Sequence, residues 1–151
     1  MNKRLSQEYE RDAKGYVIIK EGKHKFVNEK VKIYGTARAI VRESSVAYAF
    51  DSARVYANDS ARVYANDSAV VYAFGSAVVY ANDSARVYAF GSARVYAFDS
   101  ARVYAFGSAV VCAFESVRVC AFESVRVCAF GSAKIHIEDS AKIVKDKRGV
   151  E

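Results

Sequence analysis

The residues of this chain that could take part in chemistry recur in rows. Ser, Asp or Gly, Tyr and Arg return at intervals of eight residues between Gly35 and Asp146, while only His24 and His136 could act as a base near neutral pH. A catalytic centre needs unlike groups that converge in a cleft, whereas a repeat supplies like groups in rows. We therefore expect no enzyme activity, no catalytic residue and no cofactor. We assign the repeated Ser and Asp to turns between strands, where the Ser hydroxyl would bind the backbone.

Three cysteines replace tyrosine in successive copies of the repeat, at Cys112, Cys120 and Cys128. If successive copies lie on opposite sides of the molecule, Cys112 and Cys128 share one face and Cys120 lies beside His136 on the other. A metal site needs three or four converging ligands, and each face offers two. We expect outward thiols that stay reduced in a cytoplasm, with a surface disulfide as the alternative and no metal site.

The repeat has the consensus (Asp/Gly/Glu)-Ser-Ala-x-Val-Tyr-Ala-(Phe/Asn) and runs through about fourteen copies from residue 35 to residue 146. Eight residues would turn an α-helix by about 800°, so no apolar face would persist from copy to copy. The segment Ala-x-Val-x-Ala alternates with period two, and the remaining three residues are typical of a turn. Each copy therefore predicts a five-residue strand and a three-residue corner.

The residue before each valine fixes which side of the strand is buried. It is a cation in nine copies, and a buried, unpaired cation would cost several kcal/mol. We therefore expect these cations and the tyrosines to face outward and Ala-Val-Ala to face inward. The cations are Arg54, Arg62, Arg86, Arg94, Arg102, Arg118, Arg126, Lys134 and Lys142.

Two architectures share this local pattern, an antiparallel meander and a coil whose successive strands lie on opposite sides, and core volume separates them. A flat antiparallel meander would leave its Ala/Val face in water, and a closed barrel of about fourteen strands would enclose a lumen that Ala and Val cannot fill. Two opposed rows of small side chains can close tightly. We therefore predict an all-β fold, a thin two-sided parallel β-solenoid with sixteen residues per coil and about seven coils, whose handedness stays open. Corner residues recur at the same interval of sixteen, as Asp51, Asp67, Asp83 and Asp99 and as Gly75, Gly91 and Gly107.

The sequence divides into four segments. We expect a flexible or short helical N-terminus at 1–15, a basic β capping segment at 16–34, the solenoid at 35–146 and a tail at 147–151. Lys145 stands at an inward position, where we expect its charge to close the core. Residues 1–42 hold eleven Lys/Arg against five Asp/Glu, so most of the net charge of +6 lies outside the repeats and a nucleic-acid partner is not expected. We find no signal peptide or membrane span, which favours a cytoplasmic protein or a component of a phage particle.

The repeat resembles the short-repeat arrays of bacterial and phage proteins of the type A-x-V-x-A-(Y/F)-(G/D)-S, which look like thin β-solenoids and carry no agreed activity. It also looks loosely like the left-handed hexapeptide-repeat acyltransferases. The period here is eight instead of six, and no loop interrupts the array to carry a catalytic histidine, so that activity is not transferred.

The outward rows of Tyr and Arg, with Phe two residues later, are the candidate interaction surface. Their aromatic area suggests protein association, and we expect a structural module that forms a dimer or larger homo-oligomer through an aromatic face or a solenoid end. The rings could instead stack only on each other along the ladder. A second hypothesis is a ligand surface that stacks on a polysaccharide or nucleic acid. The residues are Tyr48, Tyr64, Tyr80 and Tyr96 on one face, Tyr56, Tyr72, Tyr88 and Tyr104 on the other, and Arg54, Arg62, Arg86, Arg94 and Arg102 beside them.

Overall fold

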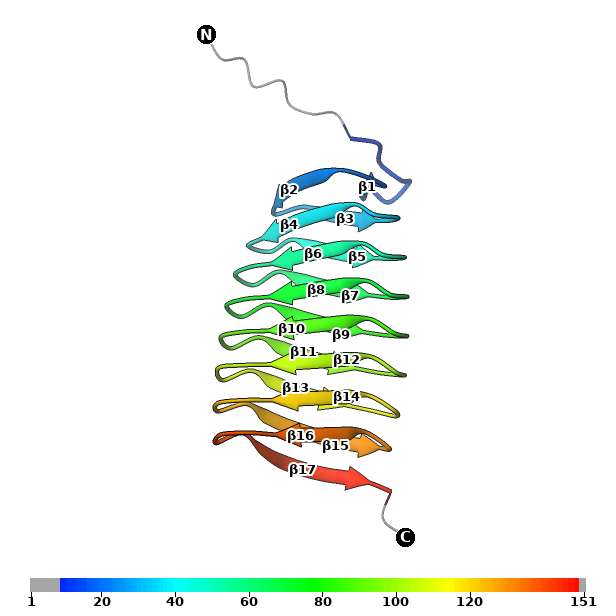
Figure 1. Cartoon of the computed structure of the whole chain (residues 1–151). Coiled ribbons are helices and arrows are strands. Elements are labelled where there is room, and N and C mark those ends of the chain that lie inside the picture. The colour runs from blue at the N-terminus through cyan, green and yellow to red at the C-terminus, as the bar shows by residue number, and fades with distance from the viewer. Residues whose placement is uncertain (1–8, 150–151) are drawn as a thin grey trace.

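The computed structural model describes residues 9–149, which form two parallel sheets stacked along one axis (Figure 1). Strands alternate between the sheets, so we call them the odd sheet and the even sheet. The odd sheet contains β1 (Val17–Ile19), β3 (Lys30–Ile33), β5 (Val46–Ala49), β7 (Arg62–Ala65), β9 (Val78–Ala81), β11 (Arg94–Ala97), β13 (Val110–Ala113), β15 (Arg126–Gly131) and β17 (Lys142–Arg148). The even sheet contains β2 (Lys23–Val27), β4 (Arg38–Arg42), β6 (Arg54–Ala57), β8 (Val70–Ala73), β10 (Arg86–Ala89), β12 (Arg102–Ala105), β14 (Arg118–Ala121) and β16 (Lys134–Ile137).

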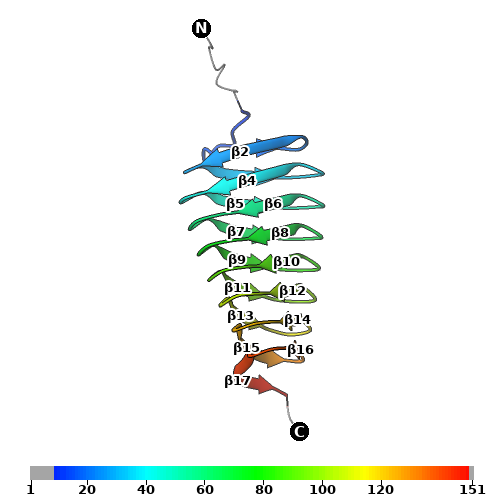
Figure 2. The same cartoon turned by 60° about the vertical axis from the view of Figure 1, so that its left-hand side comes forward.

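The pairing register confirms the predicted coil of sixteen residues. Strand β10 pairs in parallel with β12, with Arg86 beside Arg102 and Tyr88 beside Tyr104. The solenoid has about eight turns, one more than the repeat alone predicted, because residues 17–33 form three further strands of the stack. These strands close shorter coils, since Val17 pairs with Val31 and Lys23 pairs with Arg38. Both views show the sheets running the length of the stack, with the described ends at opposite ends of it (Figures 1 and 2).

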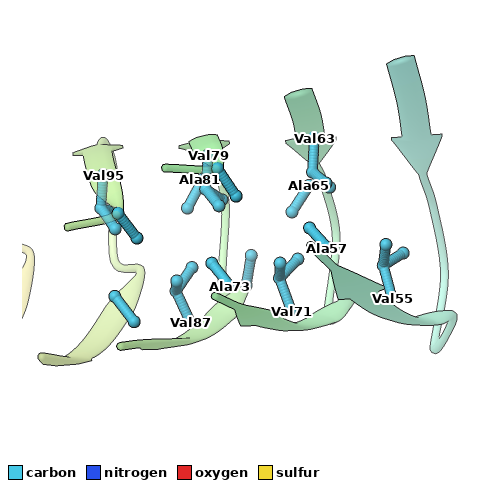
Figure 3. Packing of buried hydrophobic residues seen from close by; sticks show 14 of the residues in the cluster. Val55, Ala57, Val63, Ala65, Val71, Ala73, Val79, Ala81, Val87 and Val95 are labelled. Atoms are coloured by element: carbon cyan, nitrogen blue, oxygen red, sulfur yellow. The ribbon is translucent and has the colours of Figure 1, made fainter. Parts of the chain in front are cut away.

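The interior is the predicted pair of opposed Val and Ala rows. Valines from the odd and even strands point toward one another across a narrow gap that they and the alanines fill (Figure 3). Val63, Val71 and Val79 are 0% exposed, as are the alanines on either side of them. Burying one valine side chain stabilises the fold by about 1.5 to 3 kcal/mol, and the coils between residues 51 and 114 bury two each. The arginines before the valines are exposed, as the predicted orientation requires.

Each corner is a tight turn whose first residue adopts a positive φ. In one example the N–H of Ala53 donates to the carbonyl of Phe50 (3.1 Å), and Asp51 between them has φ 57°. Coils are tied together at this corner, because the N–H of Asp51 donates to Oδ2 of Asp67 in the next coil (3.1 Å). The corner residues alternate as predicted, with Asp at four successive coils of one corner and Gly at three of the other.

In most coils the Ser after the corner residue donates its hydroxyl to backbone, as expected. The hydroxyl of Ser68 donates to the carbonyl of Asp51 at 3.0 Å, and that of Ser84 donates to the carbonyl of Asp67 at 3.0 Å. The same contact recurs at both corners along the stack. These hydroxyls therefore belong to the coil-to-coil hydrogen bonding of the fold.

The first coil is covered by the segment before it. Asp12 accepts the N–H groups of Lys14 (2.9 Å) and Tyr16 (3.0 Å), and its other oxygen pairs with Lys32 (2.6 Å). The hydrogen bond from Lys32 holds the pKa of Asp12 below its ordinary value. The Tyr9 ring packs on Phe26 with a centroid distance of 5.2 Å. Residues 9–15 thus form a turn and an isolated antiparallel bridge, with no helix; residues 1–8 lie outside the described part of the chain.

The last coil ends differently from the prediction. Pairing of β17 with β15 sets Ile143 beside Val127 and Lys145 beside Cys128, so a bulge at Val144 shifts the strand by one residue. The prediction that Lys145 points into the core is therefore wrong. Its Nζ lies 5.7 Å from the centroid of the Phe130 ring, and Val144 is the residue pushed out, 50% exposed.

Candidate functional site: the two outer faces

Every outward residue of the repeats lies on one of two long faces, which we call the odd face and the even face after their sheets. The tyrosines fall as predicted, with Tyr48, Tyr64, Tyr80 and Tyr96 in one row of the odd face and Tyr56, Tyr72, Tyr88 and Tyr104 in one row of the even face. Arg62 and Arg94 lie on the odd face, and Arg54, Arg86 and Arg102 lie on the even face.

The tyrosine rings stack on one another along the axis. On the odd face the ring centroids are 4.7, 4.9 and 5.2 Å apart, with interplanar angles of 9°, 8° and 14°. On the even face they are 4.9, 5.0 and 5.1 Å apart, with angles of 9°, 10° and 11°. Neighbours therefore cover the flat ring faces, and the surface presents ring edges and hydroxyls.

This stacking limits what the aromatic rows can bind. The tyrosines are half-buried, and within residues 9–149 only Val27, Phe74 and Val144 count as exposed large hydrophobic side chains. A base or sugar that stacks needs an open ring face, which only the last ring of each row could offer. The arrangement favours contacts with ring edges and phenol oxygens over the stacked ligand of the second sequence hypothesis.

The two faces differ in the row beside tyrosine. On the even face a cation occupies this row in almost every coil, and on the odd face cations alternate with valine. The even row is Lys23, Arg38, Arg54, Val70, Arg86, Arg102, Arg118 and Lys134. The odd row is Lys30, Val46, Arg62, Val78, Arg94, Val110, Arg126 and Lys142.

A groove of about 510 Å³ runs along the even face between the cation row and the adjacent serine row. It is lined by Ser52, Ser68, Ser84, Ser100 and Ser116 on one side and by Val70, Arg86, Arg102 and Arg118 on the other. Among the described residues, none of these three arginines has a carboxylate within ion-pair distance. Sequence reasoning predicted that Arg118 faces outward but left Arg118 and Val70 out of the candidate surface and missed the groove, although sorting the repeats by sixteen residues would have revealed this row.

The cysteines lie where the register predicted. Cys112 and Cys128 are neighbours on the odd face, and Cys120 lies beside His136 on the even face. Burial, and next the charge of Cys128, raise the pKa of the Cys112 thiol to about 11. No group of three His, Cys, Asp or Glu side chains able to hold a metal ion occurs within the described range.

Comparisons with protein-family models, with curated proteins and with solved structures found no match to this chain. Residues 9–149 contain no helix long and apolar enough to cross a membrane.

Proposed function

We propose that this protein is a non-enzymatic structural module, a straight rod that associates with a second copy of itself through the odd face. The observation that carries the proposal is the alternation of Arg and Val along that face, from Val46 to Arg126. Association through the even face is disfavoured, since its arginines stand in consecutive coils and two such faces would repel each other.

Between Val46 and Arg126 the odd row is complementary to itself when reversed, while the lysines at its two ends, Lys30 and Lys142, lie opposite each other. A two-fold axis along the strand direction between β9 and β11 places Val78 opposite the Arg94 of the second copy, Arg62 opposite Val110, and Val46 opposite Arg126. Each guanidinium then faces an apolar side chain rather than another cation. In the neighbouring row the same axis sets Tyr64 opposite the smaller Cys112. Such an isologous, closed contact is the commonest form of homo-oligomer.

The size of the face predicts a weak dimer. At about 4.8 Å per coil the repeat stack is about 34 Å long, and at about 3.3 Å per residue a strand offers a face about 15 Å wide. The projected area of roughly 500 Å² per partner is below the roughly 800 Å² of a standard interface. We therefore expect a dissociation constant in the micromolar range or weaker. Association would become extensive only where many rods are held close together.

The proposal includes a cellular role for the rod. The resemblance of the repeat to bacterial and phage short-repeat arrays supports a spacer or scaffold role, in the cytoplasm or within an assembled particle. The ends of the solenoid are less suited to association, because the edge strands β2 and β17 are rich in Lys and Arg, which discourage pairing with another edge.

The test is a pair of matched variants at the same repeat position on opposite faces. Val78→Arg sets a cation opposite the Arg94 of the second copy, and the two-fold axis repeats this contact. Two unit charges about 5 Å apart repel by about 0.8 kcal/mol in water. We expect sedimentation velocity to show association weakened by at least about tenfold. Val70→Arg adds the same charge to the even face and should leave the dissociation constant unchanged.

Two outcomes would overturn the proposal. One is a parent protein that stays monomeric up to millimolar concentration. The other is an equal loss of association in the Val70→Arg and Val78→Arg variants, which would mean that net charge and not the odd face governs association. Both substituted residues are half-buried and occupy positions where other copies already carry Arg, so both variants should fold.

A further inference from the structure

We infer that the groove on the even face binds a linear acidic polysaccharide, one that carries hydroxyl groups and about one anionic group per sugar. This inference concerns a different surface from the proposed self-association and does not depend on it. It rests on the charge of one wall of the groove, the hydrogen-bonding state of the other wall and the spacing of both.

The charged wall repeats at the length of one coil. Arg86, Arg102 and Arg118 occupy three consecutive even strands, and Lys134 continues the row in β16. The neighbouring tyrosine rings show the spacing directly, with centroids 4.9 to 5.1 Å apart. This distance is close to the length of one sugar in an extended chain, so an acidic sugar polymer can present one anion to each coil. Guanidinium groups donate paired N–H groups that suit carboxylate and sulfate oxygens.

Three of the five serine hydroxyls on the opposite wall can only accept. The protons of Ser68, Ser84 and Ser100 are donated to the carbonyls of Asp51, Asp67 and Asp83 at 3.0, 3.0 and 3.1 Å. A hydroxyl that has donated its single proton still offers lone pairs. A ligand fits this wall when it supplies donors, and the hydroxyls of a sugar do so. Polyphosphate, which has acceptor oxygens and no hydroxyl along its chain, does not.

Nucleic acids fit the groove less well than a sugar polymer. Non-specific binding of single strands relies on aromatic platforms for the bases, and here the ring faces of Tyr72 and Tyr88 are covered by their neighbours in the row. A duplex winds its phosphates around an axis, so it cannot follow a straight row over the five coils that line the groove.

An acidic row at the adjacent corner limits the charge density of the ligand. Asp51, Asp67 and Asp83 each precede a groove serine, and each holds one carboxylate oxygen against the N–H of the previous coil. These exposed carboxylates repel anions that approach along the serine wall. They therefore favour a polymer whose anions lie along one edge, toward the arginines, with hydroxyls along the other.

Isothermal titration calorimetry with an oligogalacturonide longer than the groove tests this inference. The parent should bind it saturably, and the fully methyl-esterified oligomer, which has the same backbone without charge, should not bind. The triple variant Arg86→Gln, Arg102→Gln, Arg118→Gln should bind about tenfold more weakly, as expected for the loss of three exposed ion pairs. Ser84→Ala with Ser100→Ala should weaken binding about threefold, because two acceptors are lost.

The matched pair Val70→Arg and Val78→Arg supplies a test that does not depend on losing residues. Val70 lines the groove and interrupts its cation row, so Val70→Arg should tighten binding about two- to threefold. Val78→Arg adds an equal charge to the odd face and should change nothing. The inference is overturned if the two variants tighten binding equally, if the parent does not bind the oligomer, or if inorganic polyphosphate binds as tightly as the oligogalacturonide. A parent protein that is monomeric but binds the oligogalacturonide as expected would contradict only the self-association proposal.

Discussion

The odd and even faces are made from one octapeptide, yet they differ in the property that matters most for binding. Val79 under the odd face and Val87 under the even face are equally buried, and the tyrosine rows above them stack with nearly the same spacing. The residue before valine separates the faces, since Arg is continuous over β10, β12 and β14 but alternates with Val over β7, β9 and β11. The interior specifies the coil, and the outward position is free to specify a partner.

The difference between the cation rows of the two faces cannot be seen when the copies are aligned at eight residues. An alignment of copies at eight residues shows Arg or Val at one position and suggests random exchange. Sorting by sixteen residues places Val46, Val78 and Val110 on one face in alternate coils, and leaves Val70 as the single valine among the cations of the other. Whether a copy is odd or even in chain order therefore determines which face it contributes to, and the consensus does not show this.

Removing residues 75–82 gives the largest test of this comparison. The deletion removes one strand and joins Phe74 to Asp83 in register, so every later strand changes sheet. Arg86, Arg102 and Arg118 then follow Arg62 on the odd face as a continuous cation row. We expect the protein to retain its β circular dichroism and to lose association through the odd face, because cations there now face cations. The deletion also carries Arg94, Val110 and Arg126 to the even face after Val70, so any association that remains in sedimentation velocity should disappear when Val70→Arg is added.

Its control removes more of the chain but preserves parity. Deletion of residues 43–74 takes out four strands and joins Arg42 to Gly75, which keeps Val78, Arg94, Val110 and Arg126 alternating on the odd face. Association should then weaken only in proportion to the shortened face. Equal association by the parent and by the eight-residue deletion that carries Val70→Arg would show that the outward rows do not determine it.

Much of the fold could be predicted because the repeat leaves few alternatives. The cost of burying charge predicts that Arg54 faces outward and Val55 inward, and turn chemistry predicts a corner at Asp51. The spacing of Gly75 and Gly91 indicates the second corner. The predicted coils began at residue 35 and residues 16–34 were expected only as a β cap, because residues 17–33 form strands without carrying the repeat. Burial of Val17 and Val31 shows that alternation alone was sufficient there.

The candidate site was less predictable, since it depends on orientations that a one-dimensional pattern does not contain. The sequence places Tyr72 and Tyr88 in one row, but it does not show that their rings lie nearly parallel and cover each other. It predicts that the Ser84 hydroxyl binds backbone at a corner, but it does not show that the hydroxyl donates its proton to a carbonyl and keeps only acceptor lone pairs. Lys145 was misplaced because a bulge at one residue reverses the faces of the residues after it.

Substitutions in the interior that the two faces share should have an effect of intermediate size on the free energy of unfolding. Val79→Ala and Val87→Ala each remove two methyl groups from equivalent sites under opposite faces, and each should lower the free energy of unfolding by about 2 kcal/mol. Chemical denaturation of the two variants beside the parent measures this. A difference between them above about 1 kcal/mol would show that the outer rows alter the core, and would contradict the separation of interior and surface.

The smallest expected effect concerns the thiol of Cys112 on the odd face, whose pKa is raised from 9.0 to about 11 by burial and then by Cys128. Because the thiolate is the reactive form, alkylation by iodoacetamide should be slow at pH 8 and quicken about tenfold per pH unit up to about pH 10. Trypsin separates the three cysteines into peptides 103–118, 119–126 and 127–134, so mass spectrometry can follow Cys112 in the unmodified chain. Between these two pKa values the folded protein keeps the thiol proton that the unfolded chain loses. The free energy of unfolding should therefore fall as pH rises from about 9 to about 11, and the part of this fall that Cys112 causes should be absent in Cys112→Ser. A reaction midpoint near pH 9 would mean that the odd face does not shield the thiol.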